Sequence, residues 1–180
     1  MRIISRLDIK SENLIKGIQF EGLRVIGNPN EYALKYYNDK ADEILLIDTV
    51  ASLYNRNNIV EIIKQASANI FVPITAGGGI RELKDVEKLL KNGADKIFVN
   101  TGAVKNPSLI NDLVKEFGSQ SIVSSIEAKK VSSYKWEVYT ENGREKTNLD
   151  VEKWLLEVID RGAGEIILTS IDNDGTKKGF

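Results

Sequence analysis

The stretch Ala94-Asp95-Lys96-Ile97-Phe98-Val99 joins the end of an amphipathic helix to a short apolar strand. The same pattern occurs twice more, as Ala41-Asp42-Glu43-Ile44-Leu45-Leu46 and as Ala163-Gly164-Glu165-Ile166-Ile167-Leu168. Gly93 and Gly162 precede two of the three copies, and glycine commonly marks the end of a helix. Each copy places a charge at the first position of its strand. The repeat therefore predicts βα units whose strands share one charged N-terminal rim.

Apolar, β-prone runs alternate with amphipathic stretches along the whole chain. The expected strands lie at residues 2–9, 43–49, 70–75, 96–100, 121–127 and 165–171. The expected helices lie at residues 30–40, 57–68, 82–91, 107–117 and 150–161. Strands that are apolar throughout are typical of a parallel sheet that helices cover on its faces. We predict an α/β fold of the TIM (β/α)8 barrel type, with a doubly wound sheet as the competing architecture.

The length of the chain limits how much of a barrel it forms. Only six βα units fit into 180 residues, whereas an eight-stranded barrel takes about 250. We expect a single barrel domain over residues 1–180 that is C-terminally truncated and lacks strands 7 and 8; a sheet that stays open is the alternative. An incomplete sheet has unpaired edges, so we expect free edges at the first and sixth strands and a tendency to associate.

The composition excludes several functional classes. Lys and Arg number 25 and Asp and Glu 26, a net charge of −1 that provides no basic field for nucleic acid or an anionic membrane. No apolar run reaches the roughly 18 residues of a membrane span, and the N-terminus lacks a secretory pattern. The absence of cysteine and histidine removes thiol nucleophiles and the commonest metal ligand and general base. We expect a cytoplasmic protein that uses carboxylates, lysines and backbone amides, without metal or cofactor.

Two of the expected strands end in a carboxylate that is followed two residues later by a lysine. Asp8 lies at the end of the first strand and Glu127 at the end of the fifth. An acid at the tip of an apolar strand is costly unless it is paired or faces a site. Because these strands lie opposite each other in a closed barrel, we predict that Asp8 and Glu127 form an acid/base pair. The alternative is that both are ordinary strand-end acids paired with nearby lysines.

Small and polar residues follow three other strands. Gly77-Gly78-Gly79 and Asn100-Thr101-Gly102 follow the third and fourth strands, and together they predict a cup of backbone amides and hydroxyl groups for a phosphate. A flexible turn is the alternative for the triple glycine. Asp172-Asn173-Asp174-Gly175-Thr176 follows the sixth strand and adds a third acid at the same rim.

Two long connections lie on the C-terminal side of strands, where barrel enzymes build their active sites. The first covers residues 11–27. In the second, Asn142-Gly143 lies between residues 134–139 and residues 144–147, which is the pattern of a β-hairpin. A surface loop without a role is the alternative for each of these two connections.

With these segments assembled, the chain resembles the cyclase subunit of imidazole glycerol phosphate synthase, a phosphate-binding (β/α)8 barrel. The resemblance runs through nearly all of the chain and covers about the first three quarters of the family's barrel. The most specific segments are Leu7-Asp8, Lys16-Gly17, Gly77-Gly78-Gly79-Ile80, Gly93-Ala94-Asp95-Lys96, Asn100-Thr101, Phe117-Gly118-Ser119-Gln120, and residues 162–165 and 174–176.

The resemblance implies a reaction, a partner and a set of site residues. A glutaminase subunit, the partner in a heterodimer, delivers ammonia through the barrel. The cyclase joins this ammonia to a bisphosphorylated formimino-ribonucleotide, giving imidazole glycerol phosphate and aminoimidazole carboxamide ribonucleotide in histidine biosynthesis. The implied residues are Asp8 and Glu127 for catalysis; Lys16, Gly79, Asn100, Thr101, Asp174 and Gly175 for substrate; and Arg2, Glu43, Lys96 and Glu165 for a charged ammonia gate. A purely structural ring of salt bridges would show the same gate residues.

Several departures from the family pattern favour a paralogous branch. Glu127 replaces an aspartate, Arg6 replaces the usual cysteine, and Ser11-Glu12-Asn13 alters the first loop. Residues 17–24 and 51–58 also resemble that branch. It serves amidation or acetamidino modification of surface-polysaccharide sugars, again with a glutaminase-like partner. A further alternative is a non-catalytic remnant that only binds such a partner.

Overall fold

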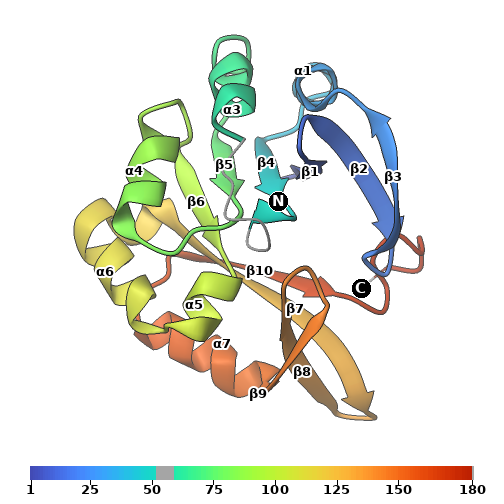
Figure 1. Ribbon diagram of the computed structural model, residues 1–180, viewed down its shortest axis with the longest axis vertical. Helices are drawn as coiled ribbons and strands as arrows, with labels where there is room; N and C mark the ends of the chain where they lie inside the picture. The colour runs from blue at the N-terminus through green and yellow to red at the C-terminus, as the bar shows by residue number, and fades with distance from the viewer. Residues whose placement is uncertain (52–58, 180) are drawn as a thin grey trace. The chain divides into compact units, whose positions relative to one another are not determined.

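The computed structural model describes residues 1–51 and 59–179 (Figure 1). The chain divides into two compact units, residues 1–15 with 24–98 and residues 16–23 with 99–180. Both contain parallel strands and helices in alternation, which confirms the predicted α/β fold. Residues 52–58 lie outside the described residues, and with them part of the predicted helix 57–68 and of the segment 51–58.

The first unit is built on parallel strands that are covered by helices. Its parallel strands are β1 (Ile4–Lys10), β4 (Glu43–Asp48), β5 (Ile74–Gly77) and β6 (Lys96–Val99), paired in that order. Its helices are α1 (Pro29–Asn38), α3 (Ile59–Ser67) and α4 (Leu83–Leu90), and α1 packs against α3 (Figure 1). Every residue of β4 is buried, as its unbroken apolar sequence predicts.

Residues 11–27 form a hairpin rather than one long connection. The strand β2 (Asn13–Ile18) pairs antiparallel with β1, and β3 (Glu21–Gly27) follows it in the sheet. Since β1 is thus paired on both sides, by β2 and by β4, the expected free edge at the first strand is wrong. The hairpin has no strong sequence pattern because β3 is mostly exposed and β2 buries only Leu14 and Ile15.

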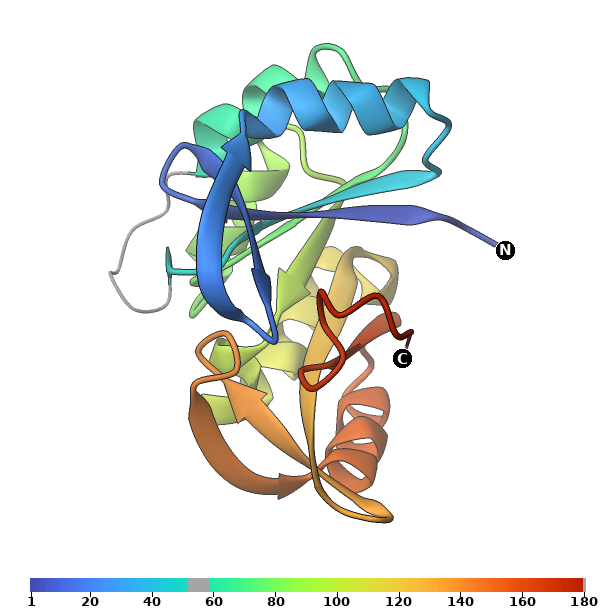
Figure 2. The same ribbon diagram turned by 90° about the vertical axis from the view of Figure 1, so that its right-hand side faces the viewer.

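The second unit combines a parallel strand pair with an antiparallel meander. The parallel pair is β7 (Ile122–Ser132) with β10 (Glu165–Ser170). In the meander, β7 pairs antiparallel with β8 (Lys135–Thr140), which pairs antiparallel with β9 (Glu145–Asp150). This confirms the predicted hairpin, and its turn places Asn142 and Gly143 at φ 58° and 75°. The helix α7 (Val151–Asp160) packs against β8 (Figure 2).

Three short elements differ from their predicted positions or were not expected. Pro73 has no N–H to donate, and β5 begins after it, at Ile74 instead of residue 70. The strand ends at Gly77, which was predicted to follow it. Asn100, which the sequence placed in the strand 96–100, precedes a short helix, α5 (Thr101–Lys105), that was not predicted. The remaining elements are α6 (Ser108–Phe117) and the 3-10 turn η1 (Ser119–Ser121). Among the helices of the described residues, none combines the length and apolar character of a membrane span.

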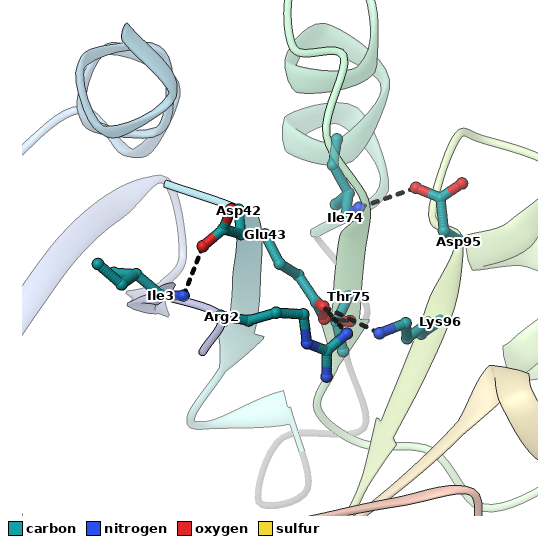
Figure 3. Close-up of polar contacts among 8 residues, drawn as sticks. All are labelled: Arg2, Ile3, Asp42, Glu43, Ile74, Thr75, Asp95 and Lys96. Atoms are coloured by element: carbon teal, nitrogen blue, oxygen red, sulfur yellow. Dashed lines mark hydrogen bonds and ion pairs between the residues drawn. The ribbon is translucent and has the colours of Figure 1, made fainter. Parts of the chain in front are cut away.

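The three copies of the repeated pattern make the same contact with the start of a neighbouring strand. Asp42 donates its N–H to the carbonyl oxygen of Ile3 (2.9 Å) and accepts the N–H of Ile3 on its carboxylate (2.7 Å; Figure 3). Asp95 makes both bonds, each 2.8 Å long, with Ile74 (Figure 3). In the third copy Gly164 keeps only the backbone bond, to Ile122 (3.0 Å). The repeat therefore fixes where neighbouring parallel strands begin.

Candidate active site

The charged rim of the first unit centres on Glu43, whose side chain is only 2% exposed. Its carboxylate accepts from the Lys96 ammonium (2.9 Å), the Arg2 guanidinium (3.3 Å) and the Thr75 hydroxyl (2.5 Å; Figure 3). A carboxylate this deeply buried is tolerated because two cations and a hydroxyl group replace its water. The structure therefore brings together three of the four predicted gate residues.

Glu165, the fourth predicted gate residue, lies in the second unit. It begins β10, as Glu43 begins β4 and Lys96 begins β6. Its side chain is half-buried, and its Cα pairs across the sheet with that of Val123. The prediction that a charge opens each of these strands is thus confirmed, whereas a joint gate with Glu165 stays a prediction.

At the opposite end of β1, Asp8 is paired with an arginine of its own strand. The Arg6 Nε donates to the Asp8 carboxylate at 2.7 Å. The two residues are two positions apart, so their side chains lie on the same face of β1. The sequence alternative expected lysines as partners of Asp8; the structure pairs Asp8 with Arg6, the residue that departs from the family pattern.

A second acid of the first unit, Asp48, was missed by the sequence reasoning. It ends β4, and in the sheet its Cα lies opposite Ile9, next to Asp8. The Asp48 side chain is buried and accepts the N–H of Val50 at 3.1 Å. Burial raises the pKa of Asp48, against the smaller opposing effect of backbone hydrogen bonds from Val50 and Ala51. The signal that could have found it is the one used for Asp8, an acid at the end of an apolar strand.

The glycines after β5 are required by close packing of the backbone. A Cβ atom on Gly78, whose φ is 114°, would lie 2.3 Å from the carbonyl oxygen of Asp48. A Cβ atom on Gly79, at φ 69°, would lie 2.8 Å from the Cβ of Ala51. Only glycine fits at both positions. This segment is therefore fixed beside the end of β4 rather than being an unconstrained turn, and its predicted binding of phosphate stays a prediction.

In the second unit, Glu127 receives a hydrogen bond from the turn between β8 and β9. The buried Glu127 carboxylate accepts the N–H of Gly143 at 2.9 Å. The same turn donates the N–H of Glu141 to the hydroxyl oxygen of Thr101 at 3.0 Å. Beside Thr101, the buried Oδ1 atom of Asn100 has no hydrogen-bond partner among the described residues. Two predicted substrate-binding residues and one predicted catalytic acid thus lie around one hairpin turn.

Lys16 and Asp174, both predicted to bind substrate, form an ion pair in the second unit. The Lys16 Nζ lies 2.9 Å from one Asp174 oxygen and 3.2 Å from the other. The backbone of Gln19 donates to the Asp174 carbonyl oxygen at 2.8 Å. A Cβ atom on Gly175 would lie 2.5 Å from the carbonyl oxygen of Gly17. The segments 16–19 and 174–175 are therefore in direct contact, which the sequence alone did not indicate.

No group of three or more carboxylates in the described ranges is arranged to hold a metal ion.

Comparison with known proteins gives one consistent result. The model of a family described as "Histidine biosynthesis protein" matches residues 2–180. A relative from Legionella pneumophila named imidazole glycerol phosphate synthase subunit HisF is 59% identical over 180 residues, which are 100% of this chain and 85% of the relative. Proteins of the same name from Hydrogenobaculum sp. and Dictyoglomus thermophilum are 51% and 46% identical over 179 residues, 99% of this chain and 71% of each relative.

Proposed function

Because this chain belongs to the histidine biosynthesis protein family, we propose that it is the cyclase subunit of an imidazole glycerol phosphate synthase. The observation that carries the proposal is 59% identity, over the whole of this chain, to a relative of that name. The substrate is a bisphosphorylated formimino-ribonucleotide, and a glutaminase subunit supplies the ammonia. Ring closure onto the carbonyl carbon of the substrate releases its oxygen as water, so the products are imidazole glycerol phosphate, aminoimidazole carboxamide ribonucleotide and water.

In this proposal the acid/base work belongs to Asp8 and Glu127. Ammonia must lose a proton as its nitrogen bonds to carbon, and the departing carboxamide ribonucleotide must gain one. A carboxylate accepts a proton when ionised and donates one when protonated, so two carboxyl groups suffice for both transfers. The buried position of Glu127 and its bond from Gly143 support a fixed orientation of this acid.

Substrate binding is proposed for residues that offer backbone amides, hydroxyl groups and one cation. Gly79, Asn100 and Thr101 would bind one phosphate, and the orphaned Oδ1 of Asn100 leaves an acceptor for a substrate hydroxyl group. Lys16 would add positive charge next to Asp174 and Gly175. At the other end of the strands, the contacts of Glu43 with Arg2 and Lys96 support a charged gate for ammonia, in which Glu165 is the fourth member.

The test is turnover of the formimino-ribonucleotide by the purified protein, first with ammonium salts and then with the glutaminase partner and glutamine. Asp8→Asn and Glu127→Gln should each lower kcat by about 10²- to 10⁴-fold, the usual contribution of a general acid or base. Asp112→Asn, on the exposed side of α6, is the matched control and should leave kcat unchanged. Full activity of both carboxylate variants would refute the proposed roles.

A second candidate function is the amidation or acetamidino modification of surface-polysaccharide sugars. The observation that favours it is the 2.7 Å pairing of Asp8 with Arg6, because this arginine occupies an oxygen of the proposed catalytic acid. In that branch ammonia is used in the same way and the acceptor differs. Amidation of a nucleotide sugar, with no turnover of the formimino-ribonucleotide, would select this function.

A third candidate is a non-catalytic protein that only binds the glutaminase. The observation that favours it is the charged rim, in which Glu43 binds Arg2 and Lys96. A surface that only binds a partner needs these charges but does not need the proposed catalytic acids. If Asp8→Asn leaves the cellular phenotype intact while Lys96→Glu abolishes it, binding rather than catalysis is the function.

A further inference from the structure

The turn at residues 141–144 contacts the short helix α5 at both of its ends. At the first residue of α5, the Thr101 hydroxyl oxygen accepts the N–H of Glu141 at 3.0 Å. At the last residue of α5, the Lys105 ammonium lies 2.8 Å from the Glu141 carboxylate. We call these two bonds the α5–turn contacts. They attach one residue of the turn to a helix that the antiparallel meander does not include.

The backbone of this turn depends on such outside contacts. Glu141, Asn142 and Gly143 follow one another at φ 53°, 58° and 75°, all in the left-handed region. Asparagine and glycine commonly adopt that region in hairpin turns, whereas glutamate disfavours it, so Glu141 adopts it at a cost that its surroundings must offset. The N–H of Arg144 donates to the carbonyl oxygen of Thr140 at 3.1 Å and closes the turn. Loss of an α5–turn contact would therefore act mainly on Glu141, whose φ would relax toward right-handed values.

Such a relaxation would move a donor away from the proposed catalytic acid. The N–H of Gly143 donates to the Glu127 carboxylate at 2.9 Å, and it lies only two residues after Glu141. On its other side Gly143 is in close contact with Phe20, since a Cβ atom there would lie 2.7 Å from Phe20 Cδ2. The position of this N–H is therefore determined by Phe20 on one side and by the α5–turn contacts on the other.

The ion pair itself is placed so that its loss has consequences. The Glu141 side chain is 7% exposed, whereas that of Lys105 is 67% exposed. A buried carboxylate that loses a cationic partner tends to move toward water, because its charge is then less well compensated. Glu141 is at the same time the first left-handed residue of the turn, so a movement of its side chain also changes the backbone that leads to Gly143.

We infer that the Lys105–Glu141 ion pair is a positioning device, which keeps the N–H of Gly143 directed at the Glu127 carboxylate. The inference rests on the proposed function for the catalytic role of Glu127, but the geometry it describes can be measured without turnover. Lys105 and Glu141 are positioning residues, since they act on the turn and on α5 rather than on reacting atoms.

The test uses Lys105→Met, with Lys146→Met as a matched control. Lys146 pairs with Glu137 on the same hairpin at 3.4 Å, and the exposed fractions of that pair, 57% and 9%, nearly equal those of Lys105 and Glu141. Both replacements remove a surface ammonium without creating a cavity. They differ in which part of the hairpin loses its partner.

The first readout is the amide proton shift of Gly143 during a pH titration followed by NMR. In the wild-type protein this shift should follow the ionisation of Glu127, and Glu127→Gln should abolish the dependence, which identifies its source. In Lys105→Met the amplitude should fall at least threefold, Lys105→Arg should restore it, and Lys146→Met should leave it unchanged. The second readout is kcat, which should fall about 10-fold to 100-fold in Lys105→Met, as expected for a displaced catalytic group.

Several results would overturn the inference. An unchanged Gly143 titration in Lys105→Met would do so whatever the activity. Equal losses of kcat and of melting temperature in Lys105→Met and Lys146→Met would also do so, because the pair would then only stabilise the hairpin. If the wild-type protein does not turn over the ribonucleotide, the proposed function fails, and the Gly143 titration alone decides the inference.

Discussion

Burial sets the protonation of Asp48 at the end of β4. Its side chain is buried, and transfer of a charge out of water is costly. The pKa of Asp48 is raised for that reason, and the hydrogen bonds from Val50 and Ala51 offset only part of the effect. Folding therefore favours the protonated form of this acid.

The pH dependence of Asp48→Asn follows from this shift. Because the pKa is higher in the folded state, protonated Asp48 stabilises the fold below its unfolded pKa of about 3.9, and this stabilisation is lost as the pH rises through the folded value. At pH 7 the wild-type protein should thus be less stable than Asp48→Asn, whose neutral amide oxygen can still accept the N–H of Val50. The difference in free energy of unfolding, measured by urea denaturation, should close on acidification. If Asp48→Asn is less stable than the wild-type protein at pH 7, the fold stabilises the ionised form of the Asp48 carboxyl group, which would contradict this prediction.

Single residues also show where sequence reasoning about the site succeeds and where it stops. Asp8 and Glu127 could be proposed from sequence because an acid at the end of an apolar strand is visible there. Their partners could not be, since an arginine in place of the family's cysteine does not show that Arg6 pairs with Asp8, and the donor to Glu127 is a backbone N–H. A backbone donor has no side-chain signature. Its position depends on the dihedral angles of the turn at residues 141–144, which the letters Asn142-Gly143 indicate only as a turn type.

At the scale of elements, the repeated pattern is a device that sets strand register. In two copies an aspartate makes a pair of hydrogen bonds with one residue at the start of the neighbouring strand: Ile3, just before β1, or Ile74, the first residue of β5. The carboxylate thereby satisfies an N–H that lies before or at the start of the sheet ladder. These bonds explain why an aspartate precedes the charged first residue of the strand in two copies. The sequence alone shows the aspartate but not its hydrogen-bond partner.

Asp95→Ala should therefore destabilise the protein. The N–H of Ile74, a fully buried residue, would lose its acceptor, which costs about 1–3 kcal/mol. Asp95→Asn keeps an acceptor oxygen at the same place and should cost less than half as much. Asp112→Ala on the exposed side of α6 is the control. Chemical denaturation gives the comparison, and an Asp95→Ala protein as stable as the control would show that water replaces the carboxylate.

The third copy of the pattern predicts a different sensitivity, because Gly164 replaces the aspartate. A Cβ atom there would lie 2.2 Å from the carbonyl oxygen of Ser119, so Gly164→Ala must displace backbone. We expect a loss of about 1–3 kcal/mol in the free energy of unfolding. Gly22→Ala, where a Cβ atom would meet nothing within 4 Å, separates the close contact from the general effect of replacing glycine; its φ of 61° still disfavours alanine. A Gly164→Ala loss no greater than that of Gly22→Ala would contradict the packing argument.

The elements that sequence could predict are those whose burial is uniform. The strand β4 is buried along its whole length and was placed within one residue of its end. The strand β3 is mostly exposed and gave no apolar run, so the hairpin at residues 11–27 was missed. In α5 the small size of the helix and Gly102 leave too weak a signal, since helices of one or two turns depend on their surroundings.

At the scale of the whole molecule, parallel strands separate two kinds of chemistry. In the first unit the charged residues Glu43 and Lys96 open their strands, whereas Asp8 and Asp48 end theirs. Five residue steps along β4 separate Glu43 from Asp48, which is about 16 Å at the usual rise of a strand. Under the proposed function, the charged rim faces the source of ammonia and the acids face the substrate. A change at the rim should then affect the delivery of ammonia without affecting its use.

Arg2→Ala is the variant that tests this separation most directly. The Arg2 side chain is 53% exposed, so its removal leaves Glu43 with the Lys96 and Thr75 bonds and should change the stability by less than about 1 kcal/mol. Glutamine-dependent turnover by the complex with glutaminase should fall about tenfold or more, because a mispositioned gate loses ammonia to water. Turnover with saturating ammonium salts should stay at the wild-type level, since external ammonia does not depend on the delivery that the gate controls. Lys91→Ala, which breaks the exposed Lys91–Glu87 pair on α4, is the control and should leave both rates unchanged. If Arg2→Ala lowers both rates equally, the rim is a structural ring of salt bridges, and the passage of ammonia through it must be abandoned.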